Sequence, residues 1–244
     1  TSFIVPPLIF KWITMKNGVY RKRPLRISSS LRTWYCAIVW ISQVVCSYII
    51  ATIMYVCGSR TLKSRECFHK MVSRTQKLDL KLIPGVKLAV KNETNEDFEK
   101  PCIIICNHQS MLDPAYLLSL NHKILVVGNE RSSLHPFING IFKWLNFYTV
   151  RKTNHKDWVD SCFERDLDIF RDYIKAGYSI AIFPEGVRNP KSNIVRYHKG
   201  SFYLAKELGV DILPIFIHGL NEVMPIGSFE INANSVTMVI KERI

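Results

Sequence analysis

The sequence predicts an α/β fold, a mixed sheet covered by helices on both faces, preceded by an N-terminal apolar helix or helical hairpin that associates with a membrane. In the larger part of the chain, short runs that are apolar throughout alternate with segments of helical periodicity. Strands without a polar face must be buried on both sides, which is typical of α/β domains. A long uncharged stretch, from Trp34 to Cys57, precedes these runs and predicts the membrane-associated part.

The stretch from Trp34 to Cys57 is rich in isoleucine, valine and aromatic residues and carries no charge. As a helix it is long enough to span a hydrocarbon core of roughly 30 Å. A buried helix of a soluble domain is the alternative, but such helices usually carry a polar stripe. Basic residues flank the stretch on both sides, which fits a segment that dips into one leaflet, or a hairpin, as well as a full crossing.

A change in composition near Leu82 predicts the domain organisation. Residues 1–81 form the membrane-associated segment, with residues 34–57 as its apolar core, and residues 82–244 form the globular domain. Five apolar runs in the globular domain predict strands, and two periodic segments, residues 157–176 and residues 202–208, predict helices. The expected strands are residues 102–106, 124–128, 179–183, 212–217 and 236–240.

The chain is strongly basic, with a formal charge of +13 at pH 7. Such a charge favours an acidic counterpart, for example nucleic acid, anionic lipid or an acidic carrier protein. The basic excess is heavy around the apolar stretch, and no pattern of basic and aromatic residues follows a sheet. We therefore expect anionic membrane lipid as a partner and do not expect nucleic acid.

The seven cysteines include no C-x-x-C pair and no matching histidine spacing. This pattern argues against a disulfide framework and against a metal site, and it suits a reducing compartment. We expect the protein at the cell inner membrane, with its globular domain on the cytoplasmic side.

The first polar cluster, CNHQSMLDP at residues 106–114, follows an apolar run at the place where functional groups gather in such sheets. His108 and Asp113 are five positions apart, an offset of about 140° on one continuous helix, so they can pair only if the chain turns between them. Asp113 followed by Pro114 favours that turn, because Asp is a good N-cap and Pro suits the first helical position. The alternative is that Asp113 only caps a helix and His108 only ends a strand.

The second polar cluster, FPEGVRNP at residues 183–190, follows the strand expected at residues 179–183. Proline cannot donate to a sheet ladder and tends to end a strand, while Gly186 permits a tight backbone. Glu185 and Arg188 follow at once, and a guanidinium matches the oxygens of phosphate or carboxylate. The alternative is an ion pair between these two side chains in solvent.

The two clusters together resemble the motifs of the glycerolipid acyltransferase family, whose best-known members are the 1-acylglycerol-3-phosphate acyltransferases. NHQSMLD resembles N-H-x-x-x-x-D and FPEGVRN resembles F-P-E-G-T-R-S, in the same order. The segment LHPFINGIFKWLNFYTVRK between them resembles the second block of the family, and LPIFIHG resembles the fourth. The resemblance covers roughly residues 82–244, and the apolar stretch lies where such enzymes carry a membrane-binding helix or helical hairpin.

The resemblance implies an enzyme that moves a fatty acyl group from acyl-CoA or acyl carrier protein to the hydroxyl of a lysophospholipid, most readily 1-acylglycerol-3-phosphate. His108 is then the general base, a role that suits an imidazole with an ordinary pKa near 6.5. Asp113 fixes the tautomer of His108 and stabilises the transient imidazolium. A protein nucleophile is not required, and neither a metal nor a cofactor other than the acyl donor is implied.

The substrate-binding residues that the resemblance implies lie around the second cluster. Arg188 grips the anionic head of the acceptor, Glu185 orients the loop or the arginine, and Gly186 lets the backbone turn closely. Lys152 and Lys199 are candidates for further contacts with phosphate groups.

Departures from the family pattern leave the acceptor open, because Val187 stands where the family usually has threonine. One alternative is an O-acyltransferase for another lyso-lipid, such as a lyso-aminoacyl lipid, and another is a catalytically silent lipid-binding module. A further alternative is an acyl-enzyme formed on Cys106. The opening segment, residues 3–18, resembles the last helix of large lipid exporters, which predicts the acyltransferase module of an exporter fusion.

Overall fold

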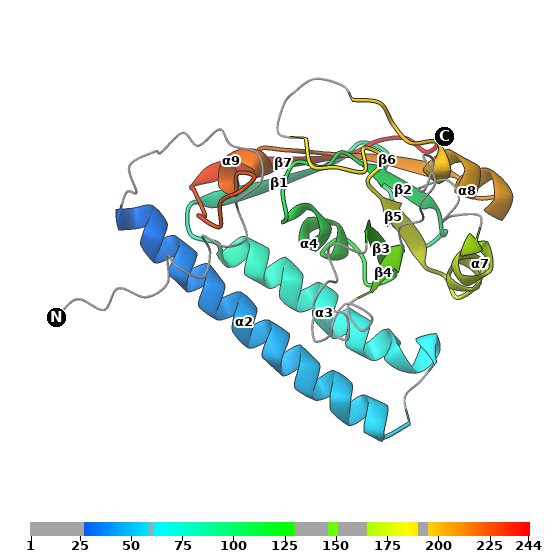
Figure 1. Cartoon of the computed structure of the whole chain (residues 1–244), viewed down its shortest axis with the longest axis horizontal. Helices are drawn as coiled ribbons and strands as arrows, with labels where there is room; N and C mark the ends of the chain where they lie inside the picture. The colour runs from blue at the N-terminus through cyan, green and yellow to red at the C-terminus, as the bar shows by residue number, and fades with distance from the viewer. Residues whose placement is uncertain (1–26, 59–60, 130–145, 151–164, 190–194) are drawn as a thin grey trace.

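A computed structural model describes residues 27–58, 61–129, 146–150, 165–189 and 195–244 (Figure 1). In these residues a seven-stranded sheet runs in the order β1-β7-β6-β2-β5-β3-β4. Neighbouring strands are parallel except β6 and β7, which are antiparallel, so the predicted mixed sheet is confirmed. The strands are β1 (Val86–Asn92), β2 (Ile103–Cys106), β3 (Ile124–Asn129), β4 (Phe147–Val150), β5 (Ser179–Ile182), β6 (Ile212–His218) and β7 (Asn234–Ile240).

Helices cover both faces of this sheet, as predicted, because the central strands are apolar on both sides. In β2, Ile104 packs in a core with residues of α3, α4 and α9, whereas Ile103 packs in a second core with residues of α7 and α8. The helices are α2 (Ile27–Val56), α3 (Leu62–Leu82), α4 (Asp113–Leu118), α7 (Leu167–Lys175), α8 (Gly200–Leu208) and α9 (Leu220–Val223).

The predicted strands are all present, with ends that shift by one or two residues. Of the helix expected over residues 157–176, residues 165–176 are described and contain α7, while residues 157–164 lie outside the described residues. Sequence reasoning did not anticipate α3, β1 or β4. β1 is an edge strand whose residues are mostly exposed, so it lacks the apolar run that marks a buried strand.

α2 and α3 form a helical pair beneath the sheet, with α3 between α2 and the sheet (Figure 1). Ala51 of α2 packs with Phe68 and Val72 of α3, and the Gln43 side chain donates a hydrogen bond to Thr75 at 2.8 Å. Cys36 of α2 and Leu80 of α3 both reach the core of the sheet. The division of the chain at residue 81 stays a prediction.

The outer face of α2 is apolar and exposed. Among the described residues, α2 is the helix long and apolar enough to cross a membrane, and only 17% of its most apolar window is buried. A core helix of a soluble protein would be mostly buried. Its exposed apolar side chains are Leu31, Trp34, Tyr35, Ile38, Ile41, Val44, Val45, Tyr48, Ile49, Ile53, Tyr55 and Val56.

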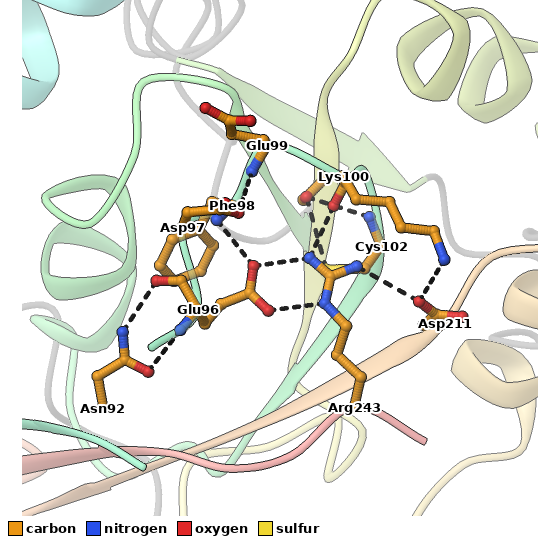
Figure 2. A network of polar contacts seen from close by, with 10 residues as sticks. Asn92, Glu96, Asp97, Phe98, Glu99, Lys100, Cys102, Asp211 and Arg243 are labelled. Atoms are coloured by element: carbon orange, nitrogen blue, oxygen red, sulfur yellow. Dashed lines mark hydrogen bonds and ion pairs between the residues drawn. The ribbon is translucent and has the colours of Figure 1, made fainter. Parts of the chain in front are cut away.

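A network of charges lies at the amino ends of β2 and β6 (Figure 2). The Arg243 guanidinium donates hydrogen bonds to both oxygens of Glu96, at 2.6 and 2.7 Å, and to the Lys100 carbonyl at 2.8 Å. Asp211 accepts hydrogen bonds from Lys100 at 2.8 Å and from Arg243 at 3.4 Å. The hydrogen bond from Arg243 lowers the pKa of the Glu96 carboxyl. This network ties the last residues of the chain to the loop before β2.

Candidate active site

A histidine and a carboxylate meet at the carboxyl end of β2. The Nδ1 atom of His108 and the Oδ2 atom of Asp113 are 2.6 Å apart, and the carboxyl side chain is fully buried. The same oxygen accepts hydrogen bonds from the backbone N–H groups of Gln109, at 2.7 Å, and Ser110, at 2.8 Å. A carboxylate accepts, so Nδ1 is assigned as the N–H of the imidazole. The Nε2 atom then keeps the lone pair that a general base requires.

The structure corrects the expectation that Asp113 is an N-cap. Asp113 is the first residue of α4, Leu112 occupies the cap position, and no side-chain capping hydrogen bond is formed there. The Asp113 carboxylate instead turns back to the preceding loop and to the imidazole. Helix capping therefore does not explain this carboxylate. Pro114 lies in the first turn, where its missing N–H has no cost.

The loop after β5 holds the backbone and ring of His108. The His108 N–H donates to the Oε1 atom of Glu185 at 3.0 Å, and the Asn189 N–H donates to the His108 carbonyl at 2.6 Å. The Phe183 ring stacks on the imidazole, with centroids 4.2 Å apart and an angle of 21° between the planes. Contacts of both kinds restrain the position of the imidazole between β2 and β5.

The partner of Glu185 in the structure is the backbone of His108 and not the side chain of Arg188. Its carboxylate is buried and binds the backbone of His108, whereas Arg188 is exposed. Within the described part of the chain, no hydrogen bond or ion pair joins the two side chains. Glu185 therefore neither orients the arginine directly nor forms the solvated ion pair that was the alternative.

Gly186 makes the tight turn of this loop possible. Its φ is +66°, a left-handed conformation that favours glycine, and the His198 ring lies 3.2 Å from the point that a Cβ atom would occupy. The Gly186 N–H donates to the Phe183 carbonyl at 3.0 Å, and the His198 N–H donates to the Pro184 carbonyl at 2.8 Å. The turn places the Glu185 carboxylate where it accepts the hydrogen bond from the His108 N–H.

Asn107 is a site residue that sequence reasoning missed. Its side-chain amide donates to the Ile217 carbonyl at 2.9 Å and accepts from the Ile217 N–H at 2.8 Å. An amide can do both because it carries a donor and an acceptor, so it continues the β2–β6 ladder beyond the end of the strand. The sequence did contain a signal for this residue, because Asn107 is the first residue of the motif NHQSMLD.

Cys106 lies in the core. Its side chain is 2% exposed, and burial, aided by the charges of Asp113 and Glu185, raises the pKa of its thiol well above the usual value. The thiolate is the nucleophilic form of cysteine, so this thiol is poorly suited to form an acyl-enzyme.

The remaining candidates are exposed or lie outside the described residues. Arg188 and Val187 are exposed in the loop after β5, and Lys199 is exposed immediately before α8. Lys152 and residues 3–18 lie outside the described residues. Among the described residues, no group of three or more His, Cys, Asp and Glu side chains could hold a metal ion.

The fold and the site together define an α/β protein with a carboxylate-held histidine at the carboxyl end of a central strand. The sequence profile described as Acyltransferase matches residues 87–218, more than half of the chain. The chain belongs to this Acyltransferase family.

Known proteins similar to this chain support the assignment. A chloroplastic 1-acyl-sn-glycerol-3-phosphate acyltransferase, BAT2 of Brassica napus, is 25% identical over 93% of this chain and 65% of its own length. The human 1-acyl-sn-glycerol-3-phosphate acyltransferase beta is 24% identical over 86% of this chain and 72% of its own length. This chain therefore spans less than two thirds of the Brassica protein.

A solved structure shares the fold. The crystal structure of the 1-acyl-sn-glycerophosphate acyltransferase PlsC from Thermotoga maritima superposes with a TM-score of 0.72 at 21% identity. The match covers 89% of this chain and 86% of that protein. The likeness extends beyond the globular domain, since 89% of the chain is more than residues 82–244 contain.

Proposed function

We propose that this protein is a membrane-bound O-acyltransferase that acylates the hydroxyl of a lysophospholipid, most readily 1-acylglycerol-3-phosphate, from an acyl thioester. The observation that carries the proposal is the hydrogen bond of 2.6 Å between His108 and Asp113 at the carboxyl end of β2. The names of the similar proteins support the class of acceptor. The donor is acyl-CoA or acyl carrier protein, and no separate cofactor is required.

The reaction follows from the position of the imidazole. The Nε2 atom of His108 takes the proton of the acceptor hydroxyl while its oxygen attacks the carbonyl carbon of the thioester. The new C–O bond forms, the C–S bond breaks, and the imidazolium returns its proton to the leaving thiolate. Asp113 stabilises the transient imidazolium through Nδ1. The products are an ester and a free thiol, with no acyl-enzyme between them.

The exposed Arg188 guanidinium binds the anionic head of the acceptor, because its donors match phosphate oxygens in pairs. Lys199 and Lys152 add further positive charge for phosphate groups. Val187 offers no hydroxyl where the family usually has one. A different acceptor, such as a lyso-aminoacyl lipid, is therefore the second candidate.

The apolar face of α2 anchors the protein in the membrane, with the catalytic domain on the cytoplasmic side of the inner membrane. Burying that face in lipid removes apolar surface from water, and the charge of +13 adds attraction to anionic headgroups. The double substitution Ile38→Asp with Ile41→Asp should release the protein from sedimented vesicles of anionic lipid. Retention equal to wild type would contradict this role of α2.

Acyl transfer to a panel of lyso-lipids, from labelled acyl-CoA and labelled acyl carrier protein, tests the proposal. We expect His108→Ala to lose roughly 100- to 10,000-fold in turnover, the contribution of a positioned base. The matched control is His122→Ala, since His122 also pairs with a carboxylate, Glu66, at 3.4 Å, but lies before β3. Wild-type activity in the His108 variant would show that His108 is not the base, whereas no activity in the wild type would favour the catalytically silent lipid-binding module.

Arg188→Ala separates acceptor binding from chemistry in the same assay. We expect a higher KM for the acceptor with a smaller change in kcat, because the guanidinium binds a part of the substrate that does not react. An unchanged KM for every acceptor in the panel would remove Arg188 from the site.

A further inference from the structure

A polar pocket lies beside the catalytic loop, which is the loop between β2 and α4 that carries His108. None of the roles proposed above involves this pocket. Its volume is about 510 Å³, within the range of roughly 300–1,000 Å³ typical of small-molecule sites. It opens between the catalytic loop, the carboxyl end of β6, α9 and the start of β7. Its lining side chains include Gln109, His218, Asn221, Glu222, Asn234 and Thr237.

In the strand order, the pocket lies on one side of His108, and the loop after β5, which carries Arg188, lies on the other side. β2 lies between β5 and β6, so His108 has the loop of Arg188 on one side and the end of β6 on the other. The Asn107 amide joins β2 to Ile217 of β6. Gln109, which follows His108, and His218, which follows Ile217, both line the pocket. A ligand held there lies beside Gln109, the residue that follows the proposed base in the same loop.

The chemistry of the lining suits a neutral ligand. Most of the polar side chains are amides and hydroxyls, which both donate and accept hydrogen bonds. Among the described residues that line the pocket, none is lysine or arginine, and Glu222 contributes a carboxylate. A phosphate group would lack a cationic partner there, whereas a chain of amide and hydroxyl groups would find partners along the wall.

We infer that this pocket binds the pantetheine arm of the acyl-thioester donor, an inference that rests on the proposed function. Two substrates must meet at one imidazole, and the anionic head of the acceptor is assigned to the Arg188 side. The donor then approaches from the β6 side. Its arm is neutral and carries two amides and a hydroxyl, the groups that the lining complements. Acyl-CoA and acyl carrier protein present the same arm, so the pocket serves either donor.

Donor kinetics of the full chain test this inference. The double variant Asn221→Ala with Thr237→Val removes an amide and a hydroxyl from the wall. We expect the KM for acyl-CoA and for acyl carrier protein to rise about fivefold for each hydrogen-bonding group lost. The KM for the lyso-lipid should stay unchanged, as should the rate with an S-ethyl acyl thioester, which lacks the arm. Glu207→Gln, an exposed change on α8, is the matched control.

Each contrary outcome overturns the inference in its own way. Unchanged donor KM values in an active variant would show that the pocket does not bind the arm, and the proposed function would stand. A rise confined to the lyso-lipid KM would assign the pocket to the acceptor. An equal loss with the S-ethyl thioester would indicate a general effect on the site.

Calorimetric titration with free pantetheine decides the same question without turnover. We expect wild type and the Glu207→Gln control to bind pantetheine and the double variant to bind it at least fivefold more weakly. Equal affinity, or no binding to wild type, would overturn the inference. Failure of acyl transfer in wild type would instead count against the proposed function.

Discussion

The two ends of the central strand β2 show how differently one fold can treat buried charge. At the amino end, Glu96 and Arg243 form a bidentate ion pair, and both side chains are largely buried (Figure 2). At the carboxyl end, Asp113 and Glu185 are both buried carboxylates, held by backbone N–H groups and an imidazole.

The difference lies in which oxygens are satisfied. Both oxygens of Glu96 accept hydrogen bonds from Arg243. In contrast, the Oδ1 atom of Asp113 and the Oε2 atom of Glu185 are buried and find no hydrogen-bond partner among the described residues. Unsatisfied buried polar atoms cost stability and are retained mainly where function requires them. The charges at the amino end are therefore paired, and the carboxyl end, with its two unpaired oxygens, is the end where we propose that the reaction takes place.

The largest effect should come from Asp113→Asn. In the amide, the oxygen must take the place of Oδ2, because that atom accepts from two backbone N–H groups as well as facing the imidazole. The imidazole then keeps its tautomer, but the negative charge that stabilises the imidazolium is lost. We expect turnover to fall roughly 100- to 10,000-fold. Initial rates of acyl transfer, with thermal melting to verify the fold, measure this effect. A loss of less than tenfold would show that the charge of the carboxylate does not assist the base.

Arg243→Ala, at the amino end of β2, should lower the stability of the protein without lowering its activity. Removing the guanidinium leaves Glu96, whose side chain is 6% exposed, without its cationic partner. We expect a loss of about 3–5 kcal/mol in the free energy of unfolding, measured by urea denaturation, with little change in kcat for the folded protein. Lys241→Ala is the control, since its partner Glu93 is 47% exposed, and we expect at most about 1 kcal/mol. Equal losses for both variants would contradict the comparison.

Glu185→Ala should lower kcat roughly tenfold, because the His108 N–H loses its acceptor and the imidazole is less well positioned. Glu185→Gln keeps an acceptor oxygen and should restore most of the activity. The KM for the acceptor should change little in either variant, since Glu185 acts through His108. Recovery of kcat in Glu185→Gln would show that the acceptor oxygen positions His108 and that the negative charge is not required. A rise in acceptor KM alone would instead assign Glu185 to substrate binding.

The smallest effect should appear in the acid dependence of stability. Arg243 lowers the pKa of folded Glu96, so this carboxyl contributes stability above its unfolded pKa of about 4.3, and the contribution is lost as pH falls through the folded value. We expect the free energy of unfolding to decrease below about pH 4.3, and to decrease less steeply in Arg243→Ala. Urea denaturation across this pH range measures both slopes. If the free energy of unfolding falls equally steeply with pH in both proteins, groups other than Glu96 dominate the acid dependence of stability.

Much of the fold could be predicted because the evidence is local. β2, β3 and β5 consist mostly of buried apolar residues. α3 escaped prediction since its many charged residues hide the few positions that reach the core. The turn was only a condition for pairing His108 with Asp113, so the pairing was favoured by the match of both polar clusters to the family motifs and not by the spacing alone.

The sequence by itself determined the apolar strands, the uncharged helix α2 and the two polar clusters proposed to carry the chemistry, because these are patterns of neighbouring residues. Only the tertiary structure decided that Glu185 accepts the N–H of His108, 77 residues away, and that Arg243 meets Glu96 across 147 residues. Contacts over such separations depend on the order of strands in the sheet. That order arises from how the whole chain packs, and no local pattern contains it.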